Sequence, residues 1–123
     1  MSFGKVQELI EGAERLSVFQ ALVRTKYASG KDQRPSMILL TDKDLFYGGL
    51  DEEKKFKRIR RHEVSSVARK GKLMLACIEL RYLEGSDEKR ILVCPFTGHP
   101  SLPRIDYDRL AELEGLIGKW IPS

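Results

Sequence analysis

Two cysteines and two histidines are the residues with the most obvious capacity for chemistry: Cys77, Cys94, His62 and His99. A thiolate beside an imidazole can act as a nucleophile, and the same groups can bind zinc. Cys94 and His99 are close in sequence, but no third group is placed to orient the histidine. No CxxC or HxxxH spacing is present either. We therefore expect no catalytic site, no metal and no cofactor, and hence a protein that is not an enzyme.

Two short patterns have some of the features of ligand-binding loops. The carboxylates of Thr41-Asp42-Lys43-Asp44 are spaced like calcium ligands, but the glycine and closing glutamate of an EF-hand loop are missing. Gly48-Gly49 is not followed by the Lys-Ser/Thr pair that reaches phosphates in a phosphate-binding loop. We interpret the first as a turn and the second as the end or a bulge of a strand.

The two cysteines lie on two predicted strands of one hairpin, residues 73–83 and 89–96. If the turn between them has only two residues, Gly85 and Ser86, the cysteines face each other and a cross-strand disulfide is possible. Any other turn length separates them. Two cysteines are too few for a disulfide framework, and we expect a reducing compartment, so we favour buried free thiols.

The most unusual feature is a basic stretch from Lys54 to Lys72, which holds nine Lys or Arg residues and one acid, Glu63. It contributes +8 to a net charge of +4, so the rest of the chain carries −4. The basic character is therefore local. Either these residues are the solvated faces of ordinary strands, or they form a surface for a polyanion.

Strand geometry limits the second interpretation, because neighbouring residues of a strand point in opposite directions. We expect Lys55, Lys57 and Arg69 to share one face, with Lys72 nearby. Such a face would attract an anionic membrane weakly and in a salt-sensitive way. We expect a diffuse surface and not a shaped headgroup pocket. Nucleic acid is not expected, because stacking aromatic residues are not interleaved with the basic ones.

The elements that would position these residues follow from the hydrophobic pattern. Val6, Leu9, Ile10, Ala13 and Leu16 recur at helical spacing, which predicts an N-terminal amphipathic helix ending near Leu16. Alternation and turn residues then predict seven strands joined by short turns. They span residues 19–27, 37–40, 45–47, 55–59, 65–70, 73–83 and 89–96.

The remaining segments are predicted to be loops and a last helix. Residues 28–36 form a charged loop, and residues 97–105, with two prolines, are expected to be irregular. Asp106 is a suitable N-cap for a helix whose apolar stripe ends at Trp120. We predict that this helix plugs one end of a barrel, with Leu113, Leu116, Ile117 and Trp120 against it.

The chain is thus predicted to be one domain, mainly β: an antiparallel barrel of about seven strands with an N-terminal helix and a capping C-terminal helix. Residues 1–17 form the first helix, which we expect on the outside of the sheet or on a second subunit, and residues 18–123 form the barrel domain. No apolar run approaches the ~20 residues of a membrane span, and no secretory signal is evident. We expect a cytoplasmic protein, either free or peripheral at the membrane.

Two segments resemble motifs of bacterial pleckstrin-homology-like (PH-like) and GRAM-like domains. Residues 38–46, ILLTDKDLF, are similar to the LxLTxxRLxF hairpin of that family, and residues 59–67, IRRHEVSSV, to its IPxxxIxSV corner. Arg60 replaces the proline of the corner, Arg61 an often apolar residue beside it, and Asp44 the usual arginine. The resemblance covers roughly residues 18–120 and implies a bent sheet barrel that binds lipid headgroups, peptides or its own copies.

The resemblance also implies a function and a site. We expect a non-catalytic PH-like interaction module that binds a protein partner or itself, or alternatively a weak adaptor for anionic membranes. In PH-like domains that bind phosphoinositides, the headgroup lies by the first strand-to-strand loop, which here holds Lys31 and Arg34, with Lys26 before it. The lysine followed by a basic-x-arginine cluster is absent. The candidate anion-binding residues are those of this loop and of the basic stretch: Lys31, Arg34, Lys55, Lys57, Arg69 and Lys72.

Overall fold

The computed structural model describes residues 1–25, 34–50, 54–71 and 76–121, and shows two helices, a short 3₁₀ helix and eight strands. The helices are α1 (Phe3–Ile10) and α2 (Tyr107–Gly118), and the 3₁₀ helix is η2 (Arg61–Glu63). The strands are β1 (Leu16–Arg24), β2 (Arg34–Thr41), β3 (Asp44–Gly48), β4 (Phe56–Arg60), β5 (Val64–Lys70), β6 (Cys77–Glu84), β7 (Asp87–Thr97) and β8 (Arg104–Ile105).

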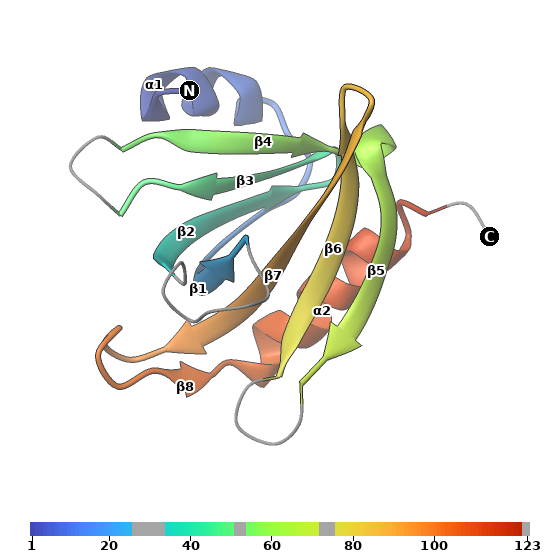
Figure 1. Ribbon diagram of the computed structural model, residues 1–123. Helices are drawn as coiled ribbons and strands as arrows, with labels where there is room; N and C mark the ends of the chain where they lie inside the picture. The colour runs from blue at the N-terminus through green and yellow to red at the C-terminus, as the bar shows by residue number, and fades with distance from the viewer. Residues whose placement is uncertain (26–33, 51–53, 72–75, 122–123) are drawn as a thin grey trace.

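All strand pairs are antiparallel and belong to one bent sheet in the order β4-β3-β2-β1-β7-β6-β5, with β8 paired to β7. Strands β2, β3 and β4 run across β5, β6 and β7, and α2 lies against the hollow of the sheet (Figure 1). The predicted mainly β fold with a helix near each end is confirmed. Among the described residues the sheet is open, because β4 and β5 end the order and are joined through η2 without pairing.

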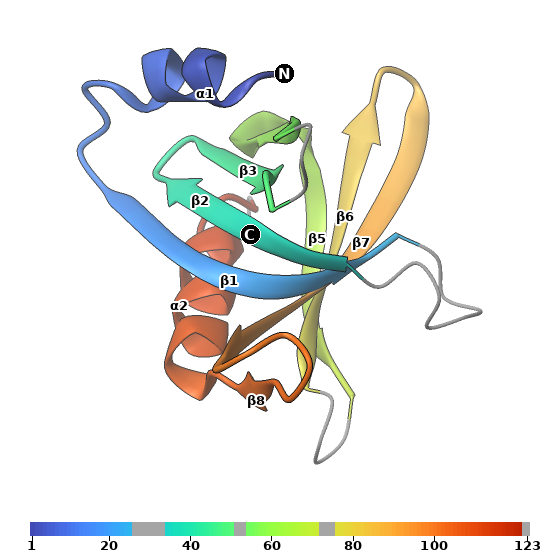
Figure 2. The ribbon, with the colours of Figure 1, turned by 90° about the vertical axis from the view of Figure 1, so that its left-hand side faces the viewer.

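Helix α2 covers the core as the sequence predicts. The Asp106 side chain accepts a hydrogen bond from the Arg109 backbone N–H at 3.1 Å and so caps the helix. Leu110, Leu113 and Ile117 are fully buried, and Trp120, which follows the helix, is 5% exposed. These side chains belong to one core cluster with residues of β1–β7, whereas Leu116 is only half-buried. In Figure 2, α2 passes behind β1 and lies to one side of β5.

Helix α1 is shorter than predicted, because it ends at Ile10 and Leu16 is already the first residue of β1. Gly12 has φ 82°, a left-handed conformation that glycine adopts without a steric penalty and that turns the chain away from the helix. Val6 is fully buried against Leu39 and Phe46. The helix therefore packs on the outside of the sheet, one of the two positions predicted (Figure 2).

Several strands differ from the sequence prediction. Strand β2 already begins at Arg34, within the segment predicted to be a loop, and β8 forms within the proline-containing segment predicted to be irregular. The longest described strand is β7, with 11 residues, and not the one before it. The β6–β7 hairpin does have the two-residue turn, since Glu84 pairs with Asp87.

Within the described ranges, no helix has the length and apolar character needed to cross a bilayer.

Candidate functional site

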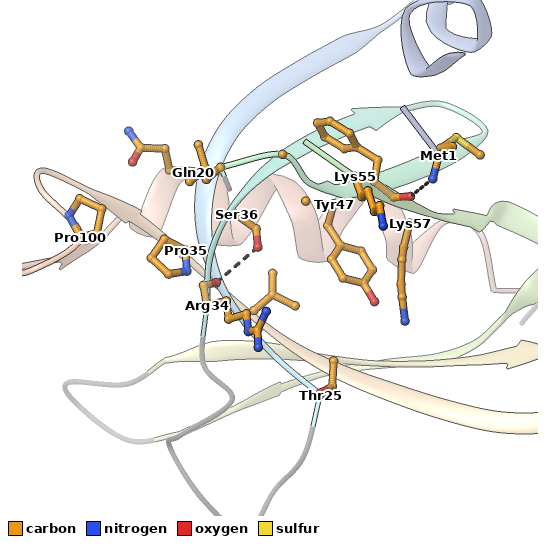
Figure 3. A pocket seen from close by; sticks show the side chains of 15 residues that line it. Met1, Gln20, Thr25, Arg34, Pro35, Ser36, Tyr47, Lys55, Lys57 and Pro100 are labelled. Carbon is orange, nitrogen blue, oxygen red and sulfur yellow. Dashed lines mark hydrogen bonds between the residues drawn. The ribbon is translucent and has the colours of Figure 1, made fainter. Parts of the chain in front are cut away.

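A cavity of about 990 Å³ lies where the β1–β4 half of the sheet opens (Figure 3). This volume is at the upper end of the roughly 300–1,000 Å³ typical of ligand sites. Its described lining comes from β1 to β4, from the chain before α1 and from the segment before β8: Met1, Gln20, Val23, Thr25, Arg34, Pro35, Ser36, Tyr47, Gly48, Gly49, Leu50, Lys55, Phe56, Lys57 and Pro100.

Three cationic side chains line this cavity: Arg34, Lys55 and Lys57. Lys57 lies opposite Tyr47 of β3, which in turn lies opposite Ile38 of β2, four residues after Arg34. Side chains two or four positions apart on a strand point to the same face, so Arg34 and Lys57 share the inner face of the sheet with core residues. Within the described part of the chain, no Asp or Glu lines the cavity. The described lining of the cavity is therefore positively charged.

Tyr47 lies between Arg34 and Lys57 in the view of Figure 3. It is 8% exposed, and its Oη is buried and completes no hydrogen bond with a described residue. Burial raises the pKa of Tyr47, and the nearby Tyr82 hydroxyl and Glu84 carboxylate act in the same direction. The phenol therefore stays protonated.

Two glycines shape the wall that carries Lys55. Gly48 and Gly49 have φ values of 139° and 85°, which L residues rarely adopt. A Cβ on Gly48 would lie 2.0 Å from the Lys55 carbonyl oxygen, and one on Gly49 would lie 2.3 Å from the Phe56 ring. Because these positions have no side chains, the end of β3 packs directly against the start of β4. The sequence identified the end of the strand but not this close contact.

The rim of the cavity is apolar on the side of α1. Met1 and Leu50 are 43% and 47% exposed, and both line the cavity. The Phe56 N–H donates to the Met1 carbonyl at 2.8 Å, which ties this segment to β4. The Phe3 ring, 38% exposed, contacts the Phe56 ring with centroids 5.8 Å apart. An exposed apolar rim thus adjoins the cationic cavity.

The structure separates the predicted anion-binding residues. Arg34, Lys55 and Lys57 come together, although the sequence treated Lys55 and Lys57 as part of an open surface. Arg69, predicted to lie with them, is on β5 and forms an ion pair with Glu114 of α2 at 3.0 Å. Lys31 and Lys72 lie outside the described residues.

Other cations of the basic stretch stabilise the fold. Arg58 pairs with Asp44 at 2.9 Å and lies over the Phe46 ring, 5.8 Å from its centroid. Arg61 donates to the Asp42 and Lys119 carbonyls at 3.4 Å. The stretch is therefore divided among several environments, as the alternation of strand residues predicts.

Of the residues considered for chemistry, Thr41 has a structural role, because its Oγ1 accepts hydrogen bonds from the Lys43 and Asp44 backbone N–H groups in the turn. His99 bonds locally to Ser101. Among the described residues, no three His, Cys, Asp or Glu side chains are grouped as a metal site would require.

No protein-family model matches this chain, and no curated protein matches it closely enough to indicate a relative. Among solved structures, the chain is similar to the hSac2 domain from the human phosphoinositide phosphatase Sac2. The TM-score is 0.58 at 12% sequence identity, and the match covers 100% of this chain and 87% of that domain. At this identity the likeness supports a shared fold.

Proposed function

We propose that this protein is a non-catalytic binding module whose cavity receives a phosphorylated headgroup at an anionic membrane surface. The observation that carries the proposal is the convergence of Arg34, Lys55 and Lys57 on one cavity, with no acid in its described lining. Each basic residue near an anionic surface contributes about 1 kcal/mol, and an arginine can also bind phosphate through two parallel hydrogen bonds.

The surroundings of the cavity favour a lipid over a soluble anion. Met1 and Leu50 present apolar surface at the rim, beside the cations. A side chain in this position can enter the interface of a bilayer while the cavity holds the headgroup. The similar hSac2 domain comes from a phosphoinositide phosphatase, which is consistent with a lipid ligand. A peripheral position at the cytoplasmic face of a membrane is part of this proposal.

The test compares vesicles of equal surface charge, one set with phosphatidylserine and the other with a phosphoinositide. A cavity that holds a phosphomonoester should favour the phosphoinositide at equal charge, whereas a diffuse patch should not discriminate. Soluble inositol phosphates should compete if the headgroup itself is bound. The opposite outcome is equal binding to both kinds of vesicle, with salt abolishing both in parallel. That result would show only long-range electrostatic attraction and would contradict headgroup binding in the cavity.

Variants locate the binding. Arg34→Gln and Lys57→Gln should each weaken phosphoinositide binding roughly fivefold, which corresponds to about 1 kcal/mol per lost charge. Lys89→Gln is the matched control, because it removes the same charge from the exposed part of β7, outside the cavity. A loss in the control as large as in the two cavity variants would argue against a localised site.

Self-association or binding of a protein partner is the second candidate. It is supported by Leu16 and Val18, which are 46% and 49% exposed at alternate positions of β1 and so form an apolar strip on the outer face. Light scattering across a concentration series distinguishes the two candidates. A mass that rises toward a dimer, and returns to that of a monomer in Val18→Ser, would support self-association through this strip.

A further inference from the structure

The two cysteines lie directly opposite each other on neighbouring strands. Ile78 pairs with Val93 in the β6–β7 hairpin, so the preceding and following residues, Cys77 and Cys94, are cross-strand partners. Opposed residues of an antiparallel pair have Cα atoms about 4.5–5.5 Å apart. That separation lies within the range of about 4.4–6.8 Å that disulfides require. Both residues are free thiols in this structure.

The side chains of this pair point to the outer face of the sheet. Their neighbours Ile78 and Val93 belong to the core, and strand residues alternate between faces. Cys77 is 6% exposed, and Cys94 is half-buried. Of the two residues, Cys94 is the more exposed, and we take it as the first to meet a soluble reagent.

The surroundings favour a thiolate. The Cys94 thiol donates a hydrogen bond that lowers the pKa of Cys77 to about 7, against the opposing effect of burial, and Arg24 acts in the same direction as that bond. The same interaction raises the pKa of Cys94, so the pair keeps its second proton in the hydrogen bond between the two sulfurs, where it can pass from one sulfur to the other. Lys70 lies opposite Cys77 on β5 and adds a cation to this face. A low-pKa thiolate near cations is typical of reactive cysteines.

We propose that Cys77 and Cys94 are a redox site that closes reversibly into a cross-strand disulfide by exchange with a small disulfide such as oxidised glutathione. This inference is independent of the proposed function, because neither cysteine lines the cavity.

Two exchange steps balance the reaction. Cys94 passes its proton to the Cys77 thiolate and attacks one sulfur of the small disulfide, whose S–S bond breaks and releases a thiolate. This leaving thiolate takes the proton from Cys77. The Cys77 thiolate then attacks the Cys94 sulfur of the mixed disulfide and releases the second small thiolate, which takes a proton from water. Two protein sulfurs are oxidised, and the small disulfide is reduced to two thiols.

The test uses the whole folded chain at low concentration, equilibrated with mixtures of oxidised and reduced glutathione. Intact mass should show the loss of two hydrogen atoms, and free-thiol titration after unfolding should fall to zero. Non-reducing electrophoresis should show a monomer. Excess reduced glutathione should reverse each change. The oxidised chain should also unfold at a higher urea concentration, because the bridge constrains the unfolded chain.

Cys77→Ser is the informative variant, since it leaves Cys94, the more exposed cysteine, without a resolving partner. It should accumulate the glutathione adduct on Cys94, whereas the unchanged chain should pass through that adduct to the internal bridge. Measurements on the unchanged chain remain decisive if the variant folds poorly. The proposal is overturned if the folded unchanged chain gives only stable adducts or linked dimers, or if the bridge forms only in urea.

Discussion

At the scale of single residues, Gly48 is the position where the backbone itself fixes the cavity wall. A Cβ there would lie 2.0 Å from the Lys55 carbonyl oxygen, and the φ of 139° would strain any L residue. Gly48→Ala should therefore destabilise the domain by about 2–4 kcal/mol in urea unfolding, since backbone strain and a steric clash add. Gly115→Ala is the control, because a Cβ in α2 would meet nothing within 4 Å.

The control should change stability in the opposite direction, by about 0.5–1 kcal/mol, since alanine favours the helix more than glycine does. Equal stability of Gly48→Ala and the unchanged chain would contradict the close contact between the end of β3 and the start of β4.

Glu112 is a residue whose ionisation should stabilise the fold. A hydrogen bond from Ser17 lowers the pKa of Glu112 to about 2, with further contributions from Arg109 and Arg15, although burial opposes them. Arg109 and Arg15 donate to the carboxylate at 2.6 and 3.1 Å. Because the pKa is lower in the folded than in the unfolded chain, the stabilisation is present above about pH 4.5 and is lost as pH falls toward 2.

Glu112→Gln should consequently lower the unfolding free energy by about 1 kcal/mol at pH 7, a value reduced by solvent screening of the arginines. The difference from the unchanged chain should disappear near pH 2. Urea unfolding from pH 2 to 7 measures this, with Glu114→Gln, a side chain 40% exposed, as the control. A difference that stays constant across this range would show that the carboxylate charge plays no part.

At the scale of elements, the strands were predictable because their inner and outer residues alternate along the chain. In β1, Phe19, Ala21 and Val23 are buried between more exposed neighbours, and this alternation is visible in the sequence. The end of α1 was not predictable, because Ala13 and Leu16 continue the helical spacing past Ile10. The helix ends earlier, since the backbone turns away at Gly12.

Proline explains the other errors. Pro35 suggested a loop, but it lies in β2, where it pairs with β1. The pairing of β2 with β3 begins only at Met37, so β3 does not lie beside Pro35. A missing N–H is tolerated where a strand has a neighbour on one side only. Strand β8 has two residues and follows Pro103, so it carries no detectable alternation. The order β4-β3-β2-β1 is the one expected of consecutive strands joined by short turns. No local pattern specifies the strand registers that bring Arg34 near Lys57.

Helix α1 should behave as a separate element, because Val6 packs in a small cluster on the outside of the sheet and not in the main core. Val6→Asp would place a charge at a fully buried site and should release the helix. Hydrogen exchange of residues 3–10 should accelerate, while β6 and β7 keep their protection. Gln7→Asp, on the exposed face, is the control. Faster exchange in β6 and β7 as well would show that α1 and the core unfold together.

At the scale of the whole molecule, the proposed orientation places the cavity mouth and its apolar rim on the bilayer. Leu50 is 47% exposed at this rim, and Leu83, 45% exposed, lies beside the β6–β7 turn. Leu50→Ser should weaken vesicle binding roughly fivefold, because part of a leucine side chain no longer enters the interface. It should leave the affinity for soluble inositol phosphates unchanged, since all three cations remain. Leu83→Ser should change neither affinity.

If both leucine variants weakened vesicle binding equally, the bilayer would not face the cavity. A loss of inositol phosphate binding in Leu50→Ser would instead mean that Leu50 shapes the headgroup site and does not enter the membrane.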